Sequence, residues 1–393
     1  MDKSLLVARS LLHARKSSLT CPAQMPIRNT PVLHIHAGLP KTGTSAIQRV
    51  LRDNRDALLA HGVLVPRTGQ REDGPHHTLL AALAGVAAPG RRVALQQLRD
   101  EIGAARPHAV LISSELFIPL LRSLLLGSAL RALARDGLRL QLHLCLRPQA
   151  DLLNSAYPQL LQTTLLPLPF ARMLALRRRL GDFERSVARL ARVAPVALHA
   201  YTPAGSRSAP WQPLLLAAGL DRGSLSALTE PGQINPSLGP LGTLFHLETA
   251  RRLAQTAPPR RLSQRLAARA ALLPLGMGLE PEPAPFTGLD AARAEQIWAE
   301  FAAGNERLAA RFWEMSWDET FAAEKAQVWQ PNARARADLS AGEAASLAGA
   351  VDHATGLAAA AVHSAQAARS VQRRLADTAA DWALRRMFRA SAR

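Results

Sequence analysis

Short apolar runs alternate with helical patterns along the first half of the chain. The first apolar run, at residues 32–35, stops at a Gly/Pro/Thr loop, and apolar residues at helical spacing follow from 43 to 61. An extended segment is predicted to begin at residues 63–65, and further strands are predicted at 109–112, 138–146 and 196–199. Strands that alternate with helices predict an α/β fold, a three-layer sandwich whose central, mostly parallel sheet is covered on both faces. Ligands of such sheets bind at the carboxyl ends of the strands.

Beyond residue 220 the pattern becomes mainly helical. Helices are expected at 241–253 and 289–313, with a Pro-rich connector at 274–285 between them. From residue 340 the chain is Ala-rich and ends in a basic segment, which predicts a long, weakly packed helix or a frayed tail, with contact to a membrane surface as the alternative. The expected organisation is a flexible basic leader at 1–30, a main domain at 31–316 and an Ala/Arg-rich helical extension or tail at 317–393.

Composition narrows the classes of function. With 48 Lys+Arg against 30 Asp+Glu, the 393-residue chain carries a formal charge of +18, which suits an anionic ligand, an acidic polymer or a membrane surface. Only four of these cations are lysine, so a general preference for arginine accounts for most of the charge. Two cysteines are too few for a disulfide framework or a Cys-based zinc site. No apolar run reaches the roughly 18 residues of a membrane span, so we expect a cytoplasmic protein.

The strongest local signal is the segment GLPKTGTS at residues 38–45, between the first strand and the first helix. Two glycines let backbone N–H groups turn toward a phosphate, the start of the helix adds partial positive charge, and a lysine adds a full one. The alternative is an ordinary strand-to-helix turn with a solvated lysine. The residues expected to bind phosphate are Pro40, Lys41, Thr42, Gly43, Thr44 and Ser45.

This loop differs from the Walker A sequence of nucleotide hydrolases, in which the lysine directly follows the last glycine. Here Lys41 precedes Gly43, and no apolar strand ends in an aspartate that would serve as the usual magnesium partner. The twelve histidines are scattered along the chain without a carboxylate at ligand spacing. We therefore expect no metal site and a donor that reacts without a divalent ion.

Residues 39–44 resemble the 5′-phosphosulfate loop of sulfotransferases that use 3′-phosphoadenosine 5′-phosphosulfate. The second half of that signature follows a later strand, where Arg147 is separated by eight residues from Ser155, as in the family's 3′-phosphate segment. Arg147 can form paired hydrogen bonds with phosphate oxygens at the strand end, and Ser155 can reach the same anion from the following helix. The resemblance covers about residues 31–316. It implies a P-loop-type fold, a doubly phosphorylated donor nucleotide and no metal.

The sequence also departs from the family in two places. Pro158 is expected to interrupt or kink the helix after Ser155, and Gln212-Pro213 stands where related chains often have Asp-Phe.

The pair His76-His77 and the segment at 233–238 also resemble bacterial members of the superfamily. The acceptor that this resemblance implies is a hydroxyl or an amine. The basic chain favours a glycan or glycolipid, and a small alcohol or a modified peptide remains an alternative.

Sulfuryl transfer needs a base for the acceptor proton and a cation for the leaving phosphate. Lys41 suits the second role. Glu115, just beyond the strand at 109–112, is the expected base, because glutamate is the base of the polysaccharide-modifying sulfotransferases that this chain resembles. His76 and His77 are rival bases, since the cytosolic small-molecule sulfotransferases use histidine. Each also has a structural interpretation: Glu115 as an acid at a helix start, and either histidine as a helix cap or an acceptor contact.

Two other classes of function remain open at this point. A P-loop kinase or nucleotide hydrolase would bind ATP with magnesium, and the displaced lysine argues against it. A nucleic-acid-binding or membrane-binding protein would cluster its basic residues with aromatic ones, yet aromatic residues make up only 4% and the arginines are spread throughout. We therefore expect no nucleic acid among the partners. Peripheral membrane contact stays open.

Overall fold

A computed structural model describes residues 30–121, 123–175, 180–202, 209–231, 238–259, 262–272, 282 and 284–367. The predicted leader, most of the Pro-rich connector, most of the segment at 233–238 and the basic C-terminal end lie outside these described residues.

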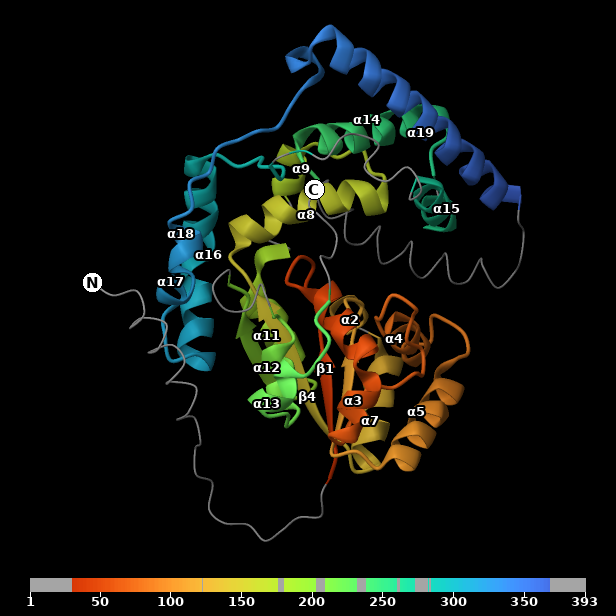
Figure 1. The fold of residues 1–393 in the computed structure, drawn as a ribbon, viewed down its shortest axis with the longest axis vertical. Helices are drawn as coiled ribbons and strands as arrows, with labels where there is room; N and C mark the ends of the chain where they lie inside the picture. The colour runs from red at the N-terminus through yellow and green to blue at the C-terminus, as the bar shows by residue number, and fades with distance from the viewer. Residues whose placement is uncertain are drawn as a thin grey trace. The chain divides into compact units, whose positions relative to one another are not determined.

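A five-stranded parallel sheet forms the centre of the fold (Figure 1). Its order is β2-β3-β1-β4-β5, and every neighbouring pair is parallel. The strands are β1 (Val32–His36), β2 (Val63–Leu64), β3 (Ala109–Ser113), β4 (Arg139–Leu146) and β5 (Val196–Ala200). The predicted α/β class is confirmed, and the fold is P-loop-like: β1, which leads into the 38–45 loop, lies between β3 and β4.

Helices cover both faces of the sheet, because successive strand residues point to opposite faces and both faces are apolar. Leu33 and Ile35 pack in one core with the helices α4 (His77–Leu83), α5 (Arg91–Ala105), α7 (Leu124–Arg135) and α11 (Phe183–Ala191). Leu111 and Cys145 pack in the other core with α2 (Thr44–Asp53), α3 (Arg55–Ala60), α12 (Gln212–Ala217) and α13 (Arg222–Ser226). The result is the expected three-layer arrangement.

The single helix predicted at 43–61 is two helices, α2 and α3, which meet at Asn54. The buried Asn54 side chain donates to the carbonyls of Val50 and Thr229, and its oxygen accepts from the Thr229 N–H. Asparagine competes in this way with the helical hydrogen bonds of its own backbone. The hydrogen bonds with Thr229, 175 residues away in sequence, therefore determine where α2 ends and α3 begins.

The helix after β4, α8 (Gln149–Thr164), contains Pro158, so the predicted interruption after Ser155 is wrong. Proline removes the hydrogen bond to the carbonyl of residue 154, but burial of the neighbouring Tyr157 and Leu161 keeps the helix continuous. The remaining helices are α6 (Phe117–Leu120), α9 (Phe170–Leu174), α14 (Pro240–Thr256), α15 (Leu262–Leu272), α16 (Ala291–Phe312), α17 (Trp317–Thr320), α18 (Ala322–Lys325) and α19 (Ala341–Ala367).

The long Ala-rich helix α19 packs against α14 and α15 (Figure 1). Leu347, Val351, Ala354 and Ala358 form a fully buried stripe at helical spacing along it. Trp317 and Phe321, in α17 and directly after it, belong to the main core beside the sheet. Among the described helices, none is long and apolar enough to cross a membrane.

Candidate functional site

The loop from β1 to α2 has an unusual backbone. Lys41 has a φ of 63° and Gly43, the N-cap of α2, has a φ of 76°, so two residues of the loop are left-handed. A non-glycine residue in this region costs about 1–3 kcal/mol and is maintained only where the surroundings require it. Within the described part of the chain, the backbone N–H groups of Lys41, Thr42 and Gly43 make no backbone hydrogen bond. These are the donors that an anion would use.

Both glycines of the loop are required by close packing. A Cβ on Gly43 would lie 2.7 Å from Pro210 and 2.9 Å from the ring of Tyr201. A Cβ on Gly38 would lie 2.7 Å from the Thr44 methyl group and 3.2 Å from Cγ of Glu115. The loop therefore passes close to side chains that follow β3 and β5, beyond the carboxyl end of the sheet.

The threonine hydroxyls stabilise the loop. Thr42 and Thr44 are buried, and both donate to the carbonyl of Leu39, at 2.8 and 3.0 Å. These hydroxyl hydrogens are already used, whereas Ser45 and Pro40 are exposed at the surface of the loop. Of the three hydroxyls in this loop, that of Ser45 makes no hydrogen bond with a described residue and lies in an exposed position.

Arg147 joins the loop to the start of α8. Its Nη1 donates to the Lys41 carbonyl at 2.9 Å and to Ser155 Oγ at 3.1 Å, and its Nη2 pairs with Asp151 at 3.1 Å. Arg147 is 8% exposed as a whole residue, and its guanidinium carbon lies 5.8 Å from the centre of the Tyr201 ring. The two halves of the predicted anion site, 106 residues apart in sequence, thus meet at one side chain.

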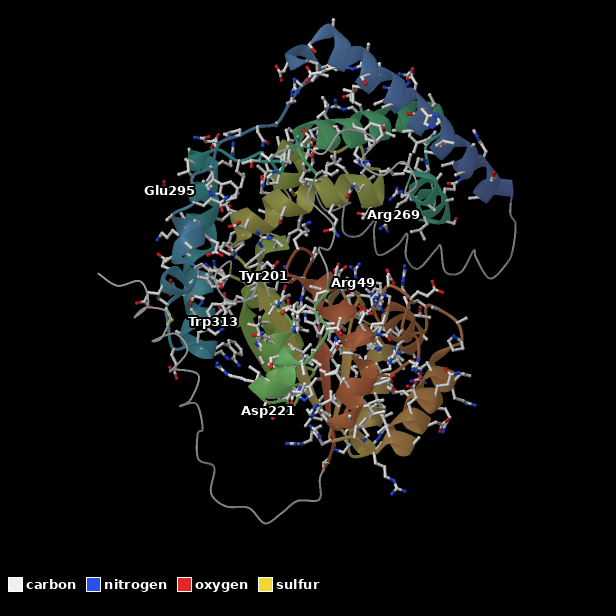
Figure 2. All side chains as sticks on the ribbon, in the orientation of Figure 1. Arg49, Tyr201, Asp221, Arg269, Glu295 and Trp313 are labelled. Carbon is white, nitrogen blue, oxygen red and sulfur yellow. The ribbon has the colours of Figure 1, made fainter. Side chains whose placement is uncertain are left out.

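Two residues of this site escaped the sequence analysis. Asp151 orients the Arg147 guanidinium. An acid four residues after an arginine at the start of a helix commonly pairs with it, and this spacing could have identified Asp151 from the sequence. Tyr201 follows β5, and its N–H donates to the Leu146 carbonyl. Its ring would lie 2.9 Å from a Cβ on Gly43, and its centre lies 5.8 Å from Cζ of Arg147, so it contributes to the same site. Figure 2 labels Tyr201 near the end of the sheet.

Glu115 and Lys41 act on each other electrostatically. Burial raises the pKa of the Glu115 carboxyl, and the positive charge of Lys41 opposes this rise. Burial and then the nearby Arg147 lower the pKa of Lys41, while Glu115 raises it. Glu115 is half-buried and makes no hydrogen bond with another described residue, so its carboxylate is available to accept a proton.

His76 is a structural residue. It is fully buried, its Nε2 donates to the Pro66 carbonyl at 2.9 Å, and its Nδ1 accepts from the Ser113 N–H at 3.3 Å. Burial lowers its pKa to about 4. Both ring nitrogens are therefore occupied, which argues against His76 as a base. The neighbouring His77 is half-buried and contacts Ser114 Oγ at 2.7 Å through Nδ1.

Four histidines that are scattered in the sequence come together beneath the loop. His34, His143 and His199 form a chain across β1, β4 and β5, with ring nitrogens 2.9 Å apart at each step. His36, two residues after His34 on the same face, bonds Ser113 Oγ at 2.8 Å. Nitrogens that face each other at hydrogen-bond distance cannot also point at a common ion. No group of three possible metal ligands is found among the residues that the structure describes.

No protein-family model matches this chain, and no curated protein matches it. Among solved structures, a chain from a study of the PezAT chromosomal toxin-antitoxin system of Streptococcus pneumoniae is similar at 14% identity. The match covers 57% of this chain and 96% of that one, with a TM-score of 0.25. A score this low does not support an inference about activity, so function must be argued from the site itself.

Proposed function

We propose that this protein is a sulfotransferase that moves a sulfuryl group from 3′-phosphoadenosine 5′-phosphosulfate to a hydroxyl or amine, with a glycan or glycolipid as the favoured acceptor class. The observation that carries the proposal is the Arg147 side chain, which bonds both the Lys41 carbonyl and Ser155 Oγ. This side chain thereby holds the 38–45 loop, which is suited to one phosphate, next to the end of β4, which is suited to another. A doubly phosphorylated nucleotide requires two such sites close together.

The proposed reaction assigns one task to each group. The acceptor oxygen forms a bond to sulfur, the bond from sulfur to the bridging phosphate oxygen breaks, and adenosine 3′,5′-bisphosphate leaves. The acceptor proton passes to the Glu115 carboxylate. The Lys41 ammonium and the free N–H groups of the loop stabilise the charge that develops on the leaving phosphate. The mutual effect of Lys41 and Glu115 on their pKa values is consistent with both charges acting in one site.

Calorimetric titration with adenosine 3′,5′-bisphosphate tests the donor site. We expect binding without a metal ion, and a loss of about 10- to 100-fold in affinity for Arg147→Ala, because hydrogen bonds to charged groups contribute about 1.5–3 kcal/mol. Lys41→Ala should weaken binding similarly. Since Arg147→Ala leaves the Asp151 carboxylate buried without its cation, Ser155→Ala provides a milder variant of the same subsite.

A matched control is Arg139→Ala, which removes the same charge from the exposed start of the same strand. It should leave the affinity for the bisphosphate unchanged. Equal weakening by Arg139→Ala and Arg147→Ala would indicate a nonspecific charge effect. A preference for ATP with magnesium over the bisphosphate would contradict the proposal and favour the kinase or nucleotide hydrolase.

A further inference from the structure

The hydroxyl of Ser114 lies within hydrogen-bond distance of the His77 ring. Ser114 lies at the carboxyl end of β3, is fully buried, and makes two hydrogen bonds through Oγ. The Leu116 N–H donates to this oxygen at 3.2 Å, and His77 Nδ1 lies 2.7 Å from it on the other side. A turn in which serine accepts from the N–H two residues later is a standard local motif.

A buried hydroxyl hydrogen needs an acceptor. The Leu116 N–H brings its own hydrogen, so His77 Nδ1 is the acceptor available to the Ser114 hydroxyl among its described contacts. Nδ1 must then carry no proton, and in a neutral imidazole the proton lies on Nε2. Burial and the charge of Arg71 lower the pKa of His77, against the opposing effect of Asp73, and so favour the neutral ring.

We infer that His77, which bonds the residue directly before Glu115, presents an Nε2–H donor at this end of the sheet and orients the acceptor oxygen instead of removing its proton. His77 is half-buried, and its Nε2 makes no hydrogen bond with another described residue, so this N–H is available to a ligand. An attacking hydroxyl can give its proton to Glu115 while one lone pair accepts from His77. The inference rests on the proposed function. Of the two candidate bases, Glu115 then removes the proton and His77 donates a hydrogen bond.

Nitrogen-15 spectroscopy of the full chain with labelled histidine tests the tautomer without any substrate. The His77 signals are assigned by their absence in His77→Gln. We expect Nε2 protonated and Nδ1 unprotonated at neutral pH, a mixture of tautomers in Ser114→Ala, and no change at His77 in the matched control Ser113→Ala, whose hydroxyl bonds His36. A proton on His77 Nδ1, alone or in addition to Nε2, would overturn the inference.

Donor consumption tests the role, with water as the acceptor and adenosine 3′,5′-bisphosphate as the measured product. His77→Phe should lower the rate about 10²-fold, the typical effect of losing one hydrogen-bond donor from a reacting site. His77→Gln, whose amide N–H replaces Nε2–H but cannot act as a base, should recover most of that loss. Equal loss in both variants would refute the donor role. Failure of the wild type to bind the bisphosphate would instead refute the proposed function, and the tautomer would still be decided by the spectra.

Discussion

Mild acid should unfold this protein, because six of its described histidines have a lowered pKa and stay neutral when folded; five of them are buried and His199 is half-buried. Burial is the first cause of the lowered pKa in each case. The lowered values are about 4 for His34, His76, His199 and His246, about 3 for His36 and about 2 for His143. A neutral His143 ring donates one of its two hydrogen bonds, to His34 or His199, and accepts the other. A second proton on this ring would remove the accepting nitrogen and break one of the two bonds.

The direction of this pH effect follows from the number of protons that the folded and unfolded states bind. In the unfolded chain these histidines titrate near 6.5, so below that pH the unfolded state binds more protons than the folded state. The free energy of unfolding therefore falls as the pH drops from 6.5 toward the folded values of about 4. The raised pKa of Glu115 acts in the opposite direction, because the folded state then binds this proton more tightly than the unfolded state.

The magnitude is large compared with the stability of a typical domain. Between pH about 7.5 and about 5.5, each histidine that stays neutral in the folded state lowers the free energy of unfolding by about 1.4 kcal/mol. The six together lower it by about 8 kcal/mol, whereas folded proteins have about 5–15 kcal/mol in total. The fold should therefore become marginal near pH 5.5.

Urea unfolding followed by circular dichroism at several pH values measures this effect. Near pH 5.5 the unfolding equilibrium should take up about five protons, since each histidine is about 90% protonated in the unfolded state and neutral in the folded state. His143→Leu should remove about one proton from this number, and the exposed His353→Gln should leave it unchanged. Uptake of fewer than about two protons would show that the histidine cluster is solvated or charged in the folded state, and the reasoning would fail.

Three further predictions concern the site and its support. Glu115→Gln should bind adenosine 3′,5′-bisphosphate normally and lose about 10²- to 10⁴-fold in turnover; unchanged turnover would exclude Glu115 as the base. Gly43→Ala should abolish bisphosphate binding, because a Cβ would collide with Tyr201 and the φ of 76° disfavours alanine; wild-type affinity by calorimetry would contradict this. Asn305→Ala should lower the free energy of unfolding in urea by about 1–3 kcal/mol, because the buried Gln149 Oε1 loses its donor while Gln149 Nε2 keeps only the Gly181 carbonyl; an unchanged free energy of unfolding would contradict this.

The sequence alone predicted the α/β class, four of the five strands and the loop at 38–45 between β1 and α2, because these depend on local pattern. The period of apolar residues sets strand or helix within a few positions, and the glycines and Lys41 of the loop lie within a single turn of chain. The pairing of Arg147 with that loop was also predictable in outline, since both follow parallel strands and their carboxyl ends share one edge of the sheet.

Only the tertiary structure decided which groups meet and in which protonation state. The break at Asn54 depends on Thr229, and the histidine chain depends on β1 lying next to β4 and β4 next to β5. The role inferred for His77 depends on one buried hydroxyl 37 residues away. Hydrogen bonds and desolvation act over a few ångströms in space, whereas sequence patterns report only neighbours along the chain. Strand order and burial therefore fixed the chemistry of these side chains.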